Sequence, residues 1–389
     1  MINKPIDQIT EADLNDLVSA AVAEQKTLDY KRDLPGNNDA AKRELLADVS
    51  SFANTAGGDL VFGMTESGGV ATGIPGVQIG DIEQEIIRLG NIIRDGLSPR
   101  IRHTPHPVLL ANGCYVLIIR SEQSWYGPHR VIFKNDSRFY GRTTNGKYEL
   151  DVTDLRNAFL FSNTVAEKVS AFRSERILAL ANGQTLAPMV GGPKLVIHCM
   201  PLESFGNMPN HDVLSLDQID IKLLGEERLR RGSRIINFEG VIAVASGIDY
   251  SAYTQIFRNG VIEAVCVGVL TSQDPNLIPG LLYEETVVKY LPECLQIIRR
   301  LGCSPPIRVG ISLVGVRGLK LATPRYGYIM ANTPAIDRDI LTLPEIVVED
   351  LSARAVPLLK PTLDMVWNAC GEAASPYFDA GGNWIGRSN

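Results

Sequence analysis

The sequence lacks the features that mark membrane-spanning, secreted or disulfide-stabilised proteins. It has no run of about eighteen apolar residues and no basic-then-apolar N-terminus, so we expect a cytoplasmic protein with no membrane span or signal peptide. Its six cysteines are scattered singly, no Cys-x-x-Cys pair occurs, and no histidine lies at zinc-finger spacing from a cysteine. We therefore expect buried, reduced thiols.

An overall excess of positive charge is also missing. The 38 Lys and Arg against 44 Asp and Glu give a net charge of −6, which argues against a protein that coats nucleic acid through bulk charge. The balance is reversed locally, because residues 100–147 hold eight basic residues and two acidic ones. A basic surface on an acidic protein is what a phosphate-binding groove would show.

The chain of 389 residues is long enough for two globular domains. We predict an N-terminal domain over residues 1–162, a helical connector over 163–190 and a second domain over 191–389, with Gly191-Gly192-Pro193 at the last boundary. The predicted class is α+β, with a mixed sheet and flanking helices in the first domain, followed by a second α/β domain.

The segment from residue 24 to 66 predicts a strand, a helix and a strand. In 26–31, Leu28 and Tyr30 alternate with polar residues, so Asp29 and Lys31 should share the opposite face of a strand. Asn38 is a typical cap for the helix that follows, which carries an apolar stripe up to residue 53. The pair Gly57-Gly58 ends this helix before a second apolar strand over 60–64.

The remaining elements follow from the same periodicities. In the first domain we predict a helix from residue 81 to 96, and strands over 101–110, 114–120, 131–134 and 138–140. In the second domain we predict strands over 194–199, 240–245, 253–257, 261–269 and 307–314, and helices over 284–301 and 356–370. Asn259-Gly260 indicates a hairpin turn.

The N-terminal motifs, in this order and spacing, resemble the Schlafen AlbA_2 family. They are Glu24, then Asp29-Tyr30-Lys31, then a helix ending in Phe52-Ala53-Asn54-Thr55, then Gly57-Gly58, Gly63 and Glu66. The resemblance covers roughly the first 160 residues and extends to Arg138-Phe139-Tyr140-Gly141-Arg142 near the end of the domain.

The resemblance implies a metal-dependent endoribonuclease. It implies that Glu24, Asp29 and Glu66 bind Mg²⁺ or Mn²⁺, and that Lys31 lies beside the scissile phosphate; these four are the expected catalytic residues. The second acid here is Asp rather than Glu, and Asp59 is a rival for the third ligand. The competing interpretation of the acids is that they are solvated surface charges, with Lys31 simply paired to Asp29.

The expected partner is RNA, of tRNA-like structure, or DNA. The residues expected to contact it are Arg130, Lys134, Arg138, Tyr140 and Arg142, with the tyrosine available to stack on a base. The Gly-Gly pair lacks the Lys-Ser/Thr of a phosphate-binding P-loop, so we do not expect nucleotide hydrolysis. A role in antiviral defence or stress response is what the resemblance suggests.

Two other functions are open at this point. The first is a non-catalytic regulator that binds DNA or RNA through the same basic strands. The second is an oligomeric assembly protein with an inert AlbA_2 domain. Apolar residues spread over a wide arc of the predicted helix 284–301, and from this arc we expect a homo-oligomer held through residues 190–389.

Overall fold

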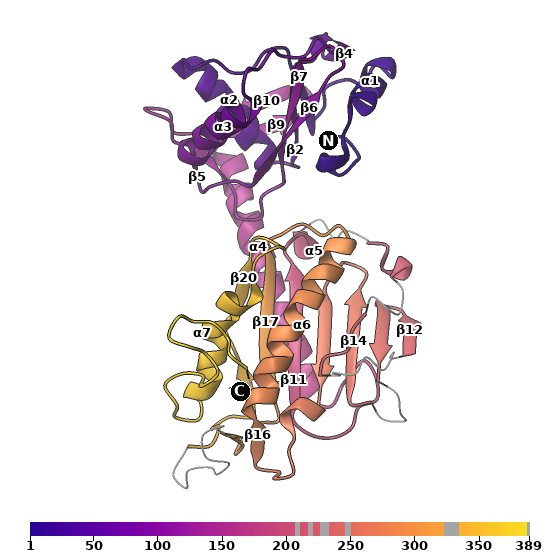
Figure 1. Ribbon diagram of the computed structural model, residues 1–389, viewed down its shortest axis with the longest axis vertical. Helices are drawn as coiled ribbons and strands as arrows, with labels where there is room; N and C mark the ends of the chain where they lie inside the picture. The colour runs from indigo at the N-terminus through magenta and orange to yellow at the C-terminus, as the bar shows by residue number, and fades with distance from the viewer. Residues whose placement is uncertain (207–210, 217–220, 226–232, 246–249, 323–333, 387–389) are drawn as a thin grey trace. The chain divides into compact units, whose positions relative to one another are not determined.

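The computed structural model describes residues 1–389 except 207–210, 217–220, 226–232, 246–249, 323–333 and 387–389. The chain divides into two compact units, Met1–Thr164 and Val165–Asn389 (Figure 1). Within the described ranges, no helix combines the length and the apolar character needed to cross a bilayer.

Unit 1 is a mixed α+β domain, as predicted. Its helices and strands, in chain order, are η1 (Ile6–Gln8), α1 (Glu11–Ser19), β1 (Leu28–Lys31), α2 (Asp39–Ala53), β2 (Gly58–Phe62), β3 (Thr65–Ser67), β4 (Val70–Gly73), α3 (Ile82–Gly96), β5 (Leu97–Ser98), β6 (His103–Leu109), β7 (Tyr115–Ser121), β8 (Arg130–Val131), β9 (Arg138–Thr143), β10 (Gly146–Glu149) and the first part of α4 (Val152–Ala181).

The predicted strand–helix–strand segment is confirmed as β1, α2 and β2. The two strands pair in parallel, and Leu28 and Tyr30 lie in the apolar core. Asp29 and Lys31 share the other face, where Lys31 Nζ lies 3.0 Å from Asp29 Oδ1. The Asn38 side chain accepts a hydrogen bond of 2.8 Å from the backbone N–H of Ala41 and so caps α2.

Two sheets build unit 1. The first has the strand order β1-β2-β7-β6, and the second the order β10-β9-β8-β5. One face of the first sheet packs on α2 and α3, and its other face packs on η1 and α1 (Figure 1). The helices therefore flank this sheet on both faces: α2 and α3 cover one face, and α1 covers the other.

Asn54 joins the end of α2 to the second sheet. Its Nδ2 donates hydrogen bonds of 2.9 Å to the carbonyl oxygens of His129 and Tyr140, and its Oδ1 accepts one of 2.6 Å from the His129 N–H. These contacts use both donors of the amide and one of the two lone pairs of its oxygen. The asparagine of the Phe-Ala-Asn-Thr motif therefore holds the two layers of the domain together.

Unit 2 is built around an eight-stranded sheet in the order β12-β13-β14-β15-β11-β17-β19, with β20 also paired to β17. Its elements after α4 are β11 (Lys194–Pro201), α5 (Glu203–Gly206), η2 (Val213–Ser215), β12 (Ser233–Asn237), β13 (Gly240–Val244), β14 (Ala252–Phe257), β15 (Ile262–Cys266), η3 (Gly268–Leu270), β16 (Leu277–Pro279), α6 (Gly280–Arg300), β17 (Ile307–Val314), β18 (Lys320–Ala322), β19 (Ile340–Thr342), β20 (Ile346–Val348) and α7 (Ala355–Asn368).

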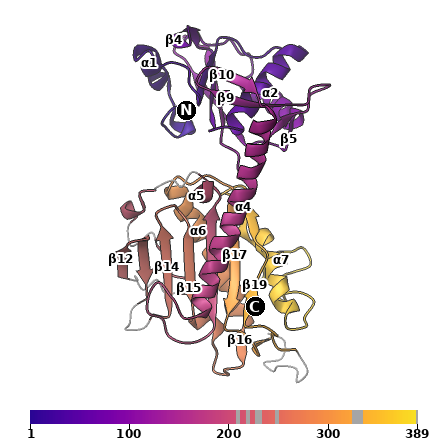
Figure 2. The same cartoon turned by 180° about the vertical axis from the view of Figure 1, so that it is seen from behind.

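Both faces of this sheet are covered. Helix α6, with α7 beside it, packs on the face seen in Figure 1, and the residues of α4 from Val165 onward pack on the face seen in Figure 2. Every residue of β15 is buried, as expected for a mostly apolar strand that is covered on both faces.

The segment predicted as a separate connector, 163–190, is not separate. It continues the helix that begins at Val152, and Val165, Val169 and Ile177 of that helix are buried in unit 2. These residues repeat every four or eight positions, so they form one stripe of the helix. The stripe identifies this part of α4 as a layer of the second domain.

The wide apolar arc of α6 is satisfied within one chain. Val287, Leu291 and Ile298 are at most 1% exposed, and the helix packs against both the sheet and α7. The arc is therefore no longer a reason to expect a self-association surface on this helix. The homo-oligomer stays a prediction without that support.

Candidate functional site

Five charged side chains from four elements of unit 1, three of them buried and two partly buried, form an ion cluster. We call the set Asp29, Lys31, Asp48, Arg142 and Lys147 the acid–base cluster. Asp29 binds Lys31 at 3.0 Å through Oδ1 and Arg142 through Oδ2. Asp48 Oδ1 lies 2.8 Å from Lys147 Nζ and 3.6 Å from Arg142 Nη1.

Arg142 is the centre of the acid–base cluster. Its side chain is 2% exposed, and its guanidinium carbon lies 4.4 Å from the centre of the Phe52 ring. Its backbone N–H donates a hydrogen bond of 3.0 Å to the Thr55 hydroxyl, which itself donates to the carbonyl of Ser51 at 2.8 Å. The Phe-Ala-Asn-Thr motif thus fixes both the backbone and the side chain of Arg142.

The cluster holds an acid that sequence reasoning missed. Asp48 lies in the middle of α2, is 2% exposed, and is flanked by the core residues Leu45, Leu46 and Val49. A charged residue inside an apolar helical stretch needs a buried partner, because an unpaired buried charge is costly. The apolar residues around Asp48 were therefore a signal in the sequence that this acid is buried. Its partners are Lys147 and Arg142.

The pKa directions follow from burial and from these ion pairs. Burial raises the pKa of Asp48, and Lys147 and Lys31 offset this only in part. Burial would also raise the pKa of Asp29, but Arg142 and Lys31 outweigh it and hold that pKa below its usual range. Burial lowers the pKa of Lys31, yet Asp48 and Asp29 reverse the shift, so Lys31 keeps its positive charge.

Glu24 lies at the edge of the acid–base cluster. Its Oε1 accepts a hydrogen bond of 2.9 Å from the backbone N–H of Tyr30, and its carboxylate interacts electrostatically with that of Asp29. Burial and, after it, the negative charge of Asp29 raise the pKa of Glu24. The two acids of the five-residue motif are thus neighbours, with pKa values displaced in opposite directions.

Glu66 and Glu24 are both hydrogen-bonded to the backbone of Gly69, but Glu66 is exposed. Its carboxylate accepts a hydrogen bond from the N–H of Gly69 in the β3–β4 turn, and the carbonyl of Gly69 accepts one from the Glu24 N–H at 2.7 Å. Asp59, the rival ligand, is fully buried and accepts two hydrogen bonds from Arg120, of 2.7 and 2.9 Å. Asp59 therefore belongs to a different ion pair.

The structure brings two of the three predicted metal ligands together. Glu24 and Asp29 present adjacent carboxylates, and carboxylate oxygen is the donor that Mg²⁺ and Mn²⁺ prefer. Glu24, Asp29 and Glu66 do not all converge within 4.8 Å among the described residues. The residues fit a hard divalent ion on condition that the exposed side chain of Glu66 turns toward the other two.

The predicted nucleic-acid contacts differ in exposure. Arg130, Lys134 and Arg138 are exposed, Tyr140 is half-buried, and Arg142 is buried. Arg138, Tyr140 and Arg142 alternate along β9 and so share one face, which leads from the surface to Asp29. A contact of Arg142 with RNA would need its ion pairs to open, and this contact stays a prediction.

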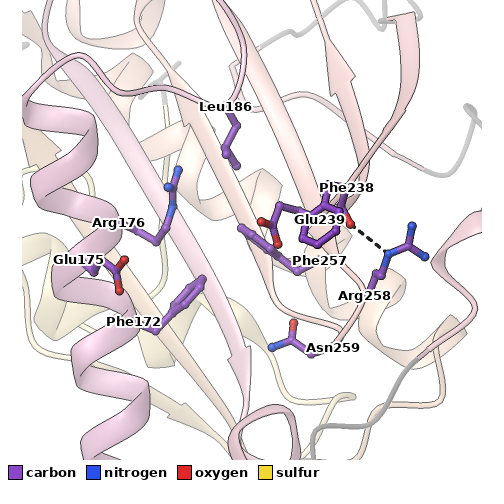
Figure 3. Close-up of a pocket in the computed structure, with 9 residues that line it drawn as sticks. All are labelled: Phe172, Glu175, Arg176, Leu186, Phe238, Glu239, Phe257, Arg258 and Asn259. Carbon is purple, nitrogen blue, oxygen red and sulfur yellow. Dashed lines mark hydrogen bonds between the residues drawn. The ribbon is translucent and has the colours of Figure 1, made fainter.

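Unit 2 has a separate cavity of about 610 Å³ between α4 and the turns at the ends of β13 and β14 (Figure 3). The rings of Phe172, Phe238 and Phe257 line it. Arg176 also lines it, but its guanidinium donates two hydrogen bonds of 2.8 Å to the buried Glu263. The charge of Arg176 is therefore already neutralised inside the domain.

Unit 1 defines a class of α+β domain in which a parallel strand pair and a Gly-Gly turn place a carboxylate pair and a lysine beside basic strands. Residues 24–151 match the family described as Schlafen, AlbA_2. The N-terminal domain of this chain is therefore a Schlafen AlbA_2 domain, which confirms the resemblance seen in its motifs.

The match with solved structures is more distant. One is the crystal structure of the DIP2311 protein from Corynebacterium diphtheriae, at 21% sequence identity and a TM-score of 0.25. The aligned region covers 36% of this chain and 26% of that one, so the chain spans about a quarter of the length of that structure. No curated protein matches the chain.

Proposed function

We propose that the N-terminal domain is a metal-dependent endoribonuclease that acts on RNA of tRNA-like structure. Glu24, Asp29 and Glu66 would hold Mg²⁺ or Mn²⁺, and Lys31 would lie beside the scissile phosphate. The observation that carries the proposal is the position of Lys31 Nζ 3.0 Å from Asp29, whose carboxylate also interacts electrostatically with that of Glu24. The basic face of β9 leads to this point.

The protonation states of Lys31 and Glu24 suit them to different roles. Lys31 remains protonated because Asp48 and Asp29 outweigh the effect of burial on its pKa, so it supplies positive charge to a phosphate. Burial and the charge of Asp29 raise the pKa of Glu24, so its carboxylate would accept a proton from an attacking water more readily than an exposed carboxylate would. A bound divalent ion would add Lewis-acid activation of that water and neutralise charge on the phosphate.

Arg142 is a positioning residue in this scheme. It binds Asp29 from the side of α2, and the Phe52 ring and the Thr55 hydroxyl hold it in place. An acid fixed in this way presents its remaining lone pairs in one direction, which favours a defined coordination geometry.

A second function has an observation of its own. Both oxygens of Asp29 already contact cations, namely Lys31 and Arg142. A carboxylate neutralised by two bases is also what a structural ion network shows. The domain would then bind DNA or RNA through Arg130, Lys134 and Arg138 without cutting it.

The test compares cleavage by matched variants. The purified full chain is incubated with total tRNA, with and without Mn²⁺, and Glu24→Gln is compared with Asp33→Asn, an exposed acid close to Asp29 in the sequence. We expect Glu24→Gln to abolish cleavage while RNA binding persists, and Asp33→Asn to cleave normally. Equal cleavage by Glu24→Gln removes the assignment, and binding without cleavage by the wild type supports the second function.

A further inference from the structure

Three side chains that can bind metal converge in unit 2, far from one another in the sequence. Glu203 begins α5, His211 lies in the segment after α5, and Cys303 follows α6. Their ligand atoms all lie within 4.8 Å of one another, and among the described residues they are the group of His, Cys and acidic side chains that meets this limit. Cys303 Sγ lies 3.4 Å from His211 Nε2, and His211 Nε2 lies 3.7 Å from Glu203 Oε1.

These separations match the edges of a tetrahedral zinc site. Zinc binds sulfur at about 2.3 Å and nitrogen or oxygen at about 2.0 to 2.1 Å, so tetrahedral angles place S and N about 3.5 Å apart, and N and O about 3.3 Å apart. The observed separations are 3.4 Å between S and N and 3.7 Å between N and O. They differ from the ideal values by about 0.1 to 0.4 Å, which small side-chain rotations can remove. The three ligand atoms are therefore close enough to bind one ion after small side-chain rotations.

The backbone orients the ligands. His211 Nδ1 lies 3.0 Å from the carbonyl oxygen of Leu301, an acceptor that requires Nδ1 to carry the proton. That tautomer leaves the lone pair on Nε2, which faces Cys303 and Glu203. A carbonyl partner on the second ring nitrogen is the usual companion of a histidine that binds metal. The N–H of Ser304 donates to Glu203 Oε1 at 2.9 Å and fixes the carboxylate.

Gly260 has no side chain, and this leaves space for Cys303 and His211. Gly260, in the turn between β14 and β15, has φ +89°, and a Cβ there would lie 2.7 Å from Cys303 Sγ and 3.0 Å from His211 Cδ2. The positive φ and the close approach both exclude a larger residue. The turn also holds His211, whose N–H donates a hydrogen bond of 2.9 Å to the carbonyl of Arg258.

We propose that Glu203, His211 and Cys303 form a site for one zinc-type divalent ion, with a fourth coordination position open to water or a ligand. A thiolate and an imidazole select zinc over Mg²⁺ or Mn²⁺, which prefer oxygen donors. Three protein ligands and an open position are the arrangement of a reactive zinc rather than of a closed structural one. The site is independent of the carboxylates in unit 1, because all of its ligands belong to unit 2.

The test uses cobalt as a spectroscopic substitute for zinc. The full chain, stripped with a chelator under reducing conditions, is titrated with Co²⁺. We expect about one equivalent per chain to produce a near-ultraviolet thiolate-to-cobalt band and intense visible bands of a tetrahedral ion, which one equivalent of Zn²⁺ abolishes. Cys303→Ser should lose the near-ultraviolet band, and His211→Gln should weaken zinc binding at least about tenfold.

Cys114→Ser is the matched control, a half-buried thiol in unit 1, and it should keep the full spectrum. If Cys303→Ser does not fold, the wild-type titration and His211→Gln still decide the question. A wild type without a thiolate band, a band that persists in Cys303→Ser, or an unchanged zinc affinity in His211→Gln overturns the proposal. In that case the three side chains form a hydrogen-bonded group only.

Discussion

Substitution of Arg142 by alanine tests whether this residue is a buried clamp or a free phosphate contact. Its guanidinium is 2% exposed and binds Asp29, which is itself 4% exposed. Arg142→Ala would leave the carboxylate of Asp29 inside the domain with Lys31 as its remaining base. A clamp predicts a large loss of stability in unit 1, whereas a surface phosphate contact predicts almost none.

The magnitude follows from the surroundings. Removing one partner of a buried ion pair costs about 3 to 5 kcal/mol, because the other charge stays buried. Lys31 still binds Asp29, and Arg142 Nε and Nη1 make no hydrogen bond in the native state, so the lower end applies. The lost stacking on Phe52 adds up to about 1 kcal/mol. We therefore expect a loss of about 3 kcal/mol in the free energy of unfolding.

Native-state hydrogen exchange measures this loss within unit 1 alone. Amides of β1 and β2 should exchange about a hundredfold faster in Arg142→Ala, since each 1.4 kcal/mol is about a factor of ten. Arg138→Ala, on the same strand but 58% exposed, should leave exchange unchanged. If both variants exchange like the wild type, Arg142 is not a clamp, and our account of the acid–base cluster fails.

Two further predictions concern other charges. Arg138→Ala should weaken RNA binding and reduce the slope of its salt dependence by about one unit. The control Arg338→Ala, which changes an exposed arginine of unit 2, should leave both the affinity and the slope unchanged. Equal effects of the two substitutions would place the RNA surface elsewhere. The second prediction concerns Glu263 in unit 2. Burial would raise the pKa of its carboxyl group, but hydrogen bonds from Arg176 and His198 outweigh burial and lower this pKa from 4.5 to about 2. The free energy of unfolding of unit 2, measured with urea, should therefore fall by about 3 kcal/mol between pH 4.5 and pH 2. The variant Glu263→Gln should not show this decrease.

The strands and helices with a clear period were predictable from the sequence. Strand β17 was predicted with the observed bounds, Ile307–Val314, because its residues are mostly apolar. The hairpin at Asn259-Gly260 was confirmed between β14 and β15. Short strands such as β5 and β10 were missed, since two to four residues carry too little periodicity.

Burial of charged residues was the main thing that the sequence did not reveal. Arg173 looks like a solvated residue of a connector, yet it is 5% exposed and donates to the carbonyls of Ile311 and Leu343 at 2.9 Å. Asp48 and Arg142 likewise read as surface charges in isolation. Each is buried by a partner more than ninety positions away, as the 99-residue separation of Asp48 and Lys147 shows, and no local pattern encodes such a pairing.

The charges of the acid–base cluster bear on how a metal ion and RNA would bind. Lys31, Arg142 and Lys147 already outnumber the carboxylates of Asp29 and Asp48, so a divalent ion beside Glu24 and Asp29 would add positive charge next to two cations. That repulsion weakens binding of the ion alone. A phosphodiester at the same place brings the compensating negative charge. Because coupling between two ligands is reciprocal, each should then raise the affinity for the other, and the site would bind the ion tightly only with RNA in place.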